Sequence, residues 1–150
     1  MRRAPRSASR QLALQVLYAV DLAAARSQGE PDVMAVFSSV AANFDLPEGA
    51  RAFAEELVCG VAEKRESLDE HIGRCARNWR VERMAAVDRN VLRLAAFELG
   101  RGEVPASVII DQAIELARRF GDDPSPAFVN GVLDAVAREL GCVEPVKEIL

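Results

Sequence analysis

The residues that most often do chemistry are few and scattered in this chain. Its cysteines are Cys59, Cys75 and Cys142, with no CxxC pair, and its only histidine is His71. Three widely spaced thiols and one imidazole do not have the spacing of zinc ligands, and an odd number of cysteines does not suit a disulfide framework. No motif surrounds a nucleophile that could pair with His71, which disfavours hydrolase chemistry. We therefore expect no catalytic site, no metal and no cofactor, and thiols that pack as small apolar side chains.

Basic side chains gather at the start of the chain. Of its 19 basic residues two are lysines, which leaves 17 arginines. The first twenty residues contain no carboxylate and four arginines: Arg2, Arg3, Arg6 and Arg10. Since the net charge is −4, residues 1–20 carry +4 and residues 21–150 carry −8. The arginine fork matches phosphate oxygens, so a basic arm on an acidic body indicates nucleic-acid contact. A solubilising tail explains the same charges equally well.

Length and composition bound the architecture. A chain of 150 residues that is 50% hydrophobic and 28% charged suits one compact domain, or two small subdomains that share a core. No apolar run approaches the ~20 residues of a membrane span. The basic N-terminus lacks the cleavage site of a signal peptide. We expect a cytoplasmic protein without a membrane segment.

Alanine-rich segments with apolar residues at helical spacing follow one another along the chain, and the fold class predicted is all-α. Short connections favour antiparallel bundles. The pattern predicts about seven helices, over residues 7–25, 31–43, 47–64, 68–76, 80–100, 105–120 and 125–140. Ser7 or Ser9, then Ser67 and Ser125, are interpreted as N-caps. Gly131, inside the last helix, indicates a close helix–helix crossing, with close approach to a ligand as the alternative.

Three ordered blocks carry a resemblance to a known family. The first is Arg10-Gln-Leu-Ala-Leu-Gln-Val-Leu-Tyr18, followed by Asp21. The second is Val87-Asp-Arg-Asn-Val-Leu-Arg-Leu-Ala-Ala-Phe-Glu-Leu99, continued by Val108-Ile-Ile-Asp-Gln-Ala-Ile-Glu-Leu-Ala117. The third is Phe128-Val-Asn-Gly-Val-Leu-Asp134. In these blocks the chain resembles the NusB family of bacterial transcription antitermination factors.

The resemblance implies a fold and a function. It implies one NusB-like helical domain over residues 1–150, with a basic arm at 1–10 and two three-helix bundle subdomains, about 7–76 and about 80–150. It implies binding rather than catalysis. Such proteins pair with NusE, a small-subunit ribosomal protein, and the pair binds the boxA element of nascent RNA. That complex joins other Nus factors on RNA polymerase and suppresses termination in ribosomal RNA operons.

Two other functions stay open beside this one. An rRNA cytosine methyltransferase carries a NusB-like RNA-binding module, although this chain has no methyltransferase motif. A self-associating helical protein is the second alternative, because some NusB-like proteins form homodimers.

The resemblance also assigns RNA-binding residues. Arg6 and Arg10 match the family's arginine-rich motif, and Arg2 and Arg3 extend it by charge alone. These arginines precede the first apolar stripe, so we expect them to carry no core contacts. Phe128 matches a family aromatic that lies next to bound RNA. A core phenylalanine on the apolar stripe of the last helix is an equally consistent interpretation.

One position near the last helix departs from the family pattern. Where a family member has an aspartate tied to RNA binding, this chain has Pro124, with Asp122 and Asp123 just upstream. Whether either aspartate takes over that contact is left open.

Partner-binding residues follow from the same resemblance. Tyr18 and Asp88 match family positions at the NusE interface. A half-buried core tyrosine and a solvated carboxylate are the alternatives. Trp79 and Arg80 are expected to plug the junction between the subdomains, and stacking on a base is the less favoured interpretation.

Overall fold

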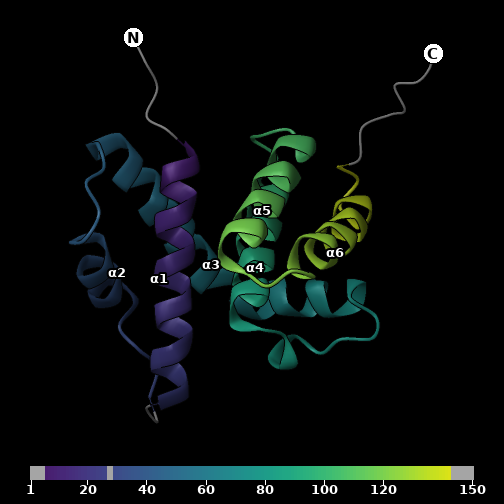
Figure 1. Ribbon diagram of the computed structural model, residues 1–150, viewed down its shortest axis with the longest axis horizontal. Helices are drawn as coiled ribbons and strands as arrows, with labels where there is room; N and C mark the ends of the chain where they lie inside the picture. The colour runs from purple at the N-terminus through teal and green to yellow at the C-terminus, as the bar shows by residue number, and fades with distance from the viewer. Residues whose placement is uncertain (1–5, 27–28, 143–150) are drawn as a thin grey trace. The chain divides into compact units, whose positions relative to one another are not determined.

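The computed structural model describes residues 6–26 and 29–142, and these residues form helices, turns and loops (Figure 1). The all-α prediction is confirmed. In chain order the elements are α1 (Arg6–Arg26), α2 (Val33–Ala41), α3 (Glu48–Cys75), the 3-10 turn η1 (Val81–Arg83), α4 (Ala86–Arg101), α5 (Ala106–Phe120) and α6 (Ser125–Glu139). Among the described residues, no helix has the length and apolar character that crossing a membrane requires.

The third and fourth predicted helices are one element, α3. Ser67, expected to cap a separate helix, lies inside it. Only Lys64 has non-helical backbone angles within α3 (φ −106°, ψ 16°), and the helix bends there. The prediction of about seven helical segments thus corresponds to six helices plus the 3-10 turn η1, with the third and fourth segments joined through the bend at Lys64.

The chain forms two compact units that divide at this bend. One unit ends at Lys64 and contains α1, α2 and the first part of α3, while the other begins at Arg65. The division lies earlier than the predicted boundary at about 76–80. The second part of α3 therefore belongs with η1, α4, α5 and α6.

In the first unit, α1 packs against α2 and is tied to α3. The Ser9 hydroxyl is buried and donates a hydrogen bond to the Ala50 carbonyl at 2.8 Å. Ser9 is therefore a link between helices, and α1 already begins at Arg6. Asp32, which the sequence interpretation missed, caps α2 by accepting from the Ala35 N–H at 3.2 Å. The buried core side chains of this unit include Leu12, Val16, Phe37, Leu57, Val58 and Val61.

In the second unit, α4 is buried over most of its length. Every residue from Asn90 to Leu99 is buried, and α5 and α6 pack on α4 and on each other. The fully buried side chains of this unit include Ile72, Leu92, Leu94, Ile109, Val129 and Leu133. Since Arg93 and Glu98 are also buried, α4 carries charged groups into the interior, and these need partners there.

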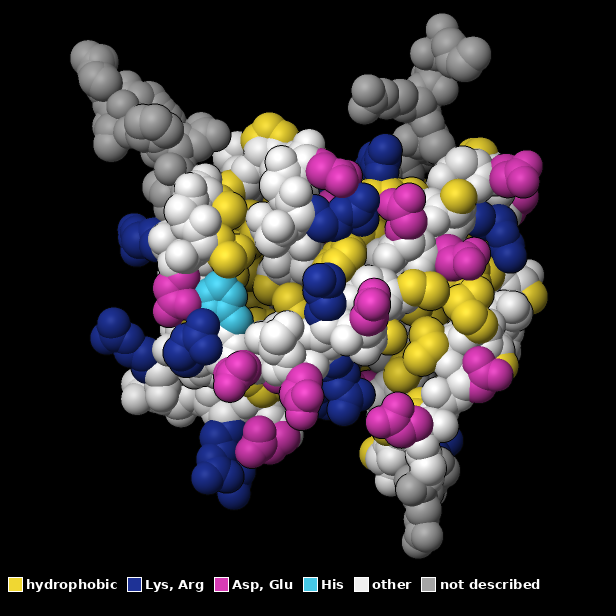
Figure 2. All heavy atoms as spheres, turned by 180° about the vertical axis from the view of Figure 1, so that it is seen from behind, with side chains coloured by type: hydrophobic (Ala, Val, Ile, Leu, Met, Phe, Trp, Pro, Cys, Tyr) yellow, Lys and Arg dark blue, Asp and Glu magenta, His cyan; other side chains and the backbone are white. Residues whose placement is uncertain are grey.

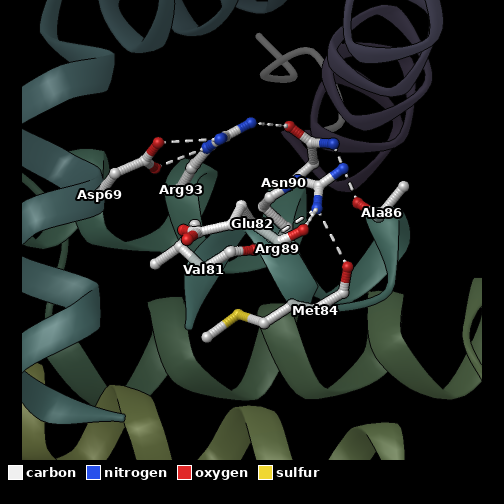
Figure 3. A network of polar contacts seen from close by, with 8 residues as sticks. All are labelled: Asp69, Val81, Glu82, Met84, Ala86, Arg89, Asn90 and Arg93. Atoms are coloured by element: carbon white, nitrogen blue, oxygen red, sulfur yellow. Dashed lines mark hydrogen bonds and ion pairs between the residues drawn. The ribbon is translucent and has the colours of Figure 1, made fainter. Parts of the chain in front are cut away.

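A polar network joins α3 to α4 (Figure 3). The Arg93 guanidinium forms a bidentate salt bridge with the Asp69 carboxylate, with Nε–Oδ1 at 2.7 Å and Nη2–Oδ2 at 2.8 Å. Its Nη1 donates to Asn90 Oδ1 at 3.1 Å, and Asn90 Nδ2 donates to the Ala86 carbonyl at 2.9 Å. Such charge-assisted bonds fix geometry as well as energy. The network therefore sets how α4 enters this unit.

Arg89 closes the turn that precedes α4. Its Nη1 donates to the Met84 carbonyl at 3.0 Å and to the Val81 and Glu82 carbonyls at 3.4 Å each (Figure 3). Carbonyls at the end of a short helix have no partner within it, so a side chain must supply one. Arg89 therefore holds η1 against the start of α4.

The two glycines near α6 have different environments. Gly131 is exposed, and a Cβ there would meet nothing within 4 Å. The predicted close crossing at Gly131 is wrong, because the helix turns this position outward. The close approach lies at Gly121, where a Cβ would stand 2.6 Å from Ser125 Oγ and 2.9 Å from the Ala117 carbonyl oxygen. Gly121 thus permits the tight turn between α5 and α6.

Candidate nucleic-acid interface

Two arginines in the first turns of α1 lie over one aromatic ring. The Arg6 guanidinium carbon is 3.8 Å from the centroid of the Phe53 ring on α3, and that of Arg10 is 5.7 Å away. Residues four apart share a helix face, so both reach the same ring. Both distances are within the range of cation–π attraction. Phe53 was not predicted, because nothing in its local sequence marks it as a binding residue.

The two arginines differ in exposure. Arg6 is exposed, whereas Arg10 is only 5% exposed. The expectation that Arg10 carries no core contact is therefore wrong, since α1 starts early enough to place Arg10 one turn before the buried Leu14. Arg6 keeps donors available for a phosphate while the ring of Phe53 supports its guanidinium. Arg2 and Arg3 lie outside the described residues.

A second aromatic cluster lies in the other unit. Phe128, in the first turn of α6, is half-buried, and its ring centroid is 5.8 Å from that of Trp79 in an edge-to-face arrangement (72°). Trp79 is 56% exposed, and the Arg80 side chain is 70% exposed. Both side chains are therefore largely in solvent, and their place at the junction between the subdomains stays a prediction.

The turn before α6 contains the position that departs from the family pattern. Pro124 immediately precedes Ser125, the first residue of α6. Ser125 was predicted as the N-cap, but its buried hydroxyl accepts from the backbone N–H of Asp122 at 3.1 Å. Asp122 and Asp123 are both exposed. Either carboxylate is thus accessible close in sequence to Phe128.

The two predicted partner-binding residues lie in different units. Tyr18, on α1, is 38% exposed. Asp88, in the first turn of α4, is half-buried, and its Oδ1 is buried without a hydrogen-bond partner among the described residues. A buried carboxylate oxygen without a hydrogen-bond partner lowers stability.

One mixed cluster of metal-ligating side chains was not expected. His71 and Cys75, one turn apart on α3, face Glu139 at the end of α6, and their ligand atoms all lie within 4.8 Å of one another. His71 Nε2 is 2.7 Å from Glu139 Oε1, and Arg74 Nη2 is 3.3 Å from the same oxygen. Nitrogen, sulfur and oxygen donors could hold a divalent ion, but Arg74 already neutralises this carboxylate. The four-residue spacing of His71 and Cys75 was the signal available in the sequence.

Two pKa shifts accompany this cluster. The hydrogen bond from Arg74 lowers the pKa of Glu139 below its usual range. Burial raises the pKa of the Cys75 thiol, and the nearby Glu139 raises it further. The cluster therefore favours a charged carboxylate beside a protonated thiol at neutral pH.

Replacing Glu139 by glutamine is expected to destabilise the protein at neutral pH and less so in acid. Because the folded-state pKa of Glu139 is lowered, its contribution is present above the unfolded-state pKa, about 4.3, and is lost as pH falls through the folded value. Urea unfolding at pH 7 and pH 3 measures the difference in the free energy of unfolding between wild type and variant. If this difference is as large at pH 3 as at pH 7, the stabilising role assigned to the charged Glu139 carboxylate is contradicted. Glu115→Gln, at an exposed pair with Arg118, is the matched control.

Charges of both signs share the surface shown in Figure 2. Basic and acidic side chains are interspersed over that face among the coloured residues. A mixed surface gives no broad field of one sign to attract a polyanion. This face therefore offers a polyanion no broad positive surface (Figure 2).

Exposed arginines beside aromatic rings on a helical scaffold indicate a helical protein of the nucleic-acid-binding class. The sequence pattern of the NusB family matches residues 7–138. The chain is 52% identical over 140 residues to the transcription antitermination protein NusB of Sorangium cellulosum, covering 93% of this chain and 96% of that protein. It is 48% identical over 136 residues to the NusB protein of Anaeromyxobacter dehalogenans strain 2CP-1, covering 90% of this chain and 92% of that protein. The chain belongs to the NusB family of transcription antitermination proteins, which are not enzymes.

Solved structures agree with this assignment. A structure of T. maritima NusB superposes with a TM-score of 0.81 at 32% identity, covering 93% of this chain and 94% of that one. A structure of the antitermination factors NusB and NusE in complex with dsRNA superposes with a TM-score of 0.78 at 26% identity, covering 89% and 96%. The resemblance seen in the sequence is confirmed, and so is the fold that it implied.

Proposed function

We propose that this chain pairs with a NusE protein in the cytoplasm and binds the boxA element of nascent ribosomal RNA operon transcripts. The complex then joins other Nus factors on RNA polymerase and suppresses termination. The observation that carries the proposal is the exposed Arg6 guanidinium, held 3.8 Å over the Phe53 ring in a member of this family. A guanidinium fixed in this way loses little freedom when it binds a phosphate. The related structure that contains NusB, NusE and RNA supports the choice of partners.

The charge distribution accounts for the need of a partner. Residues 21–150 carry −8, so most of the chain repels an RNA backbone, while residues 1–20 carry +4 and attract it. A basic ribosomal protein would add the positive surface that the body lacks. We therefore expect the pair to bind RNA more tightly than either protein alone.

A mobility-shift experiment tests the proposal. Labelled boxA RNA and a shuffled RNA of the same length are titrated with the chain, with NusE, and with the mixture. The proposal predicts that the mixture binds boxA RNA most tightly and prefers it over the shuffled RNA. Equal retention of both RNAs by all three samples would overturn it.

Replacing Asp88 by arginine is expected to lower the affinity for NusE at least tenfold, since a reversed charge at an interface repels a basic partner. Asp88 is half-buried in the first turn of α4, and its carboxylate is the charge that a basic partner would meet there. Isothermal titration with NusE measures the affinity, and circular dichroism confirms that the variant is folded.

Two further variants keep the Asp88 test decisive. Asp88→Asn removes the charge with little change in volume and should weaken binding in the same direction. Glu115→Arg reverses an exposed charge on α5 and should leave NusE affinity unchanged. Equal affinity of wild type and Asp88→Asn would remove Asp88 from the interface.

A further inference from the structure

Trp79 is placed in an unusual way for a tryptophan. It is the only tryptophan of the chain and, at 56%, the most exposed large apolar side chain among the described residues. It follows the turn that ends α3, where its backbone N–H donates to the Ala76 carbonyl at 2.8 Å. Arg77, within this turn, has a positive φ of 25°, so the chain reverses sharply just before Trp79. The backbone thus presents the indole to solvent on a defined support.

The neighbouring ring of Phe128 orients the indole. The two ring centroids are 5.8 Å apart and the planes meet at 72°, a favourable edge-to-face geometry. Because Phe128 is half-buried, it anchors the pair to α6, whereas the indole keeps more than half of its surface in water. Leaving that much apolar surface exposed forgoes hydrophobic stabilisation, and it keeps the indole accessible to a stacking partner.

The side chains around Trp79 indicate what it binds. Arg77, Arg80 and Arg83 are all exposed within four residues of it. The pair between Arg80 and Glu82 is exposed on both sides and 3.6 Å long, so it holds Arg80 weakly. An exposed aromatic face beside arginines is the combination that binds single-stranded nucleic acid, by stacking one base and contacting the adjacent phosphates.

We propose that Trp79, braced by Phe128, stacks on one unpaired nucleobase of the bound RNA, while Arg77 and Arg80 contact the flanking phosphates. This inference rests on the proposed RNA-binding function and adds a site to it. Stacking needs a base that is free of a duplex, so the site takes single-stranded RNA. Because every base has a π-face, the site contributes affinity more than sequence preference.

The single tryptophan gives a direct test. All tryptophan emission of the isolated chain arises from residue 79, so its fluorescence is followed while end-labelled single-stranded boxA RNA is titrated and label anisotropy reports binding in the same cuvette. The inference predicts that emission is quenched in parallel with the rise in anisotropy. It also predicts less quenching by the fully paired duplex. A rise in anisotropy with unchanged emission would overturn the inference and leave the proposed function standing. No anisotropy change, alone or with NusE, would overturn both.

Variants add an independent readout of the same site. Trp79→Ala should weaken binding of single-stranded RNA to the chain–NusE pair about tenfold, and Trp79→Phe should restore part of the loss. Val108→Ala, at another exposed apolar residue, is the matched control and should bind as wild type does. Equal affinities of wild type and Trp79→Ala would overturn the inference.

Discussion

Replacing Asp69 by alanine is expected to lower the free energy of unfolding by about 3 kcal/mol. The change leaves the Arg93 guanidinium, whose side chain is 7% exposed, without the carboxylate that it contacts at 2.7 and 2.8 Å. Removing one partner of a buried pair costs about 3–5 kcal/mol, and the lower end applies because the Asp69 side chain is 27% exposed. For a chain of this length the midpoint of thermal unfolding should fall by about 6–12 °C.

An exposed ion pair of the same length serves as the control, because it differs from the Asp69–Arg93 pair in burial and not in charge. Glu115 and Arg118 approach to 2.7 Å, as closely as Asp69 and Arg93, but both side chains are more than 60% exposed. Glu115→Ala should therefore cost no more than about 0.5 kcal/mol in urea unfolding. If the free energy of unfolding fell by the same small amount in Asp69→Ala and Glu115→Ala, the network between α3 and α4 would not be a source of stability.

Alanine substitutions at Arg6 and Arg10 are expected to affect different properties: RNA affinity for Arg6 and folding stability for Arg10. Arg10→Ala should lower the free energy of unfolding by about 2 kcal/mol, because a side chain that is 5% exposed loses its packing and its contact with the Phe53 ring. Arg6→Ala should cost less than about 1 kcal/mol of stability, since Arg6 is exposed. It should weaken RNA binding about tenfold through the loss of one charge-assisted phosphate contact.

Thermal unfolding and RNA anisotropy on both variants test this division of roles. Arg6→Lys serves as the conservative control, because it keeps the charge and loses the planar group over Phe53. It should retain more RNA affinity than Arg6→Ala. The opposite pattern, in which Arg6→Ala unfolds easily and Arg10→Ala loses RNA, would contradict the roles assigned to the two side chains.

Most helices were predictable because apolar spacing and terminal residues act locally. Pro47, Pro105 and Gly121 lie at helix ends where the sequence indicates them. Serines misled the prediction, since a hydroxyl can cap a helix or bond elsewhere. Ser9 bonds to Ala50 across two helices, and Ser67 lies inside α3, which continues past the bend at Lys64.

The candidate site was predictable only where residue type fixes the chemistry. The arginine-rich start of the chain was evident, but the burial of Arg10 depends on where α1 begins and on a ring, Phe53, that is more than forty residues away. Gly131 and Trp79 were assigned to interior contacts, and both are exposed. Which face of a helix meets solvent follows from tertiary packing, and a single helix pattern does not contain that information.

The measurement that tests the account most directly is the salt dependence of RNA binding with and without NusE. With Arg10 buried, at most three arginines of the first ten residues, Arg2, Arg3 and Arg6, contact phosphates. Together with the two contacts proposed for Arg77 and Arg80 this gives at most five, so the chain alone should show a slope of log K against log salt no steeper than about −3.5, since single strands release ~0.7 counterions per contact. The pair with NusE should bind more tightly and show a steeper slope. Equal affinity and equal slope in both samples would show that the partner contributes no RNA contacts and would contradict the account.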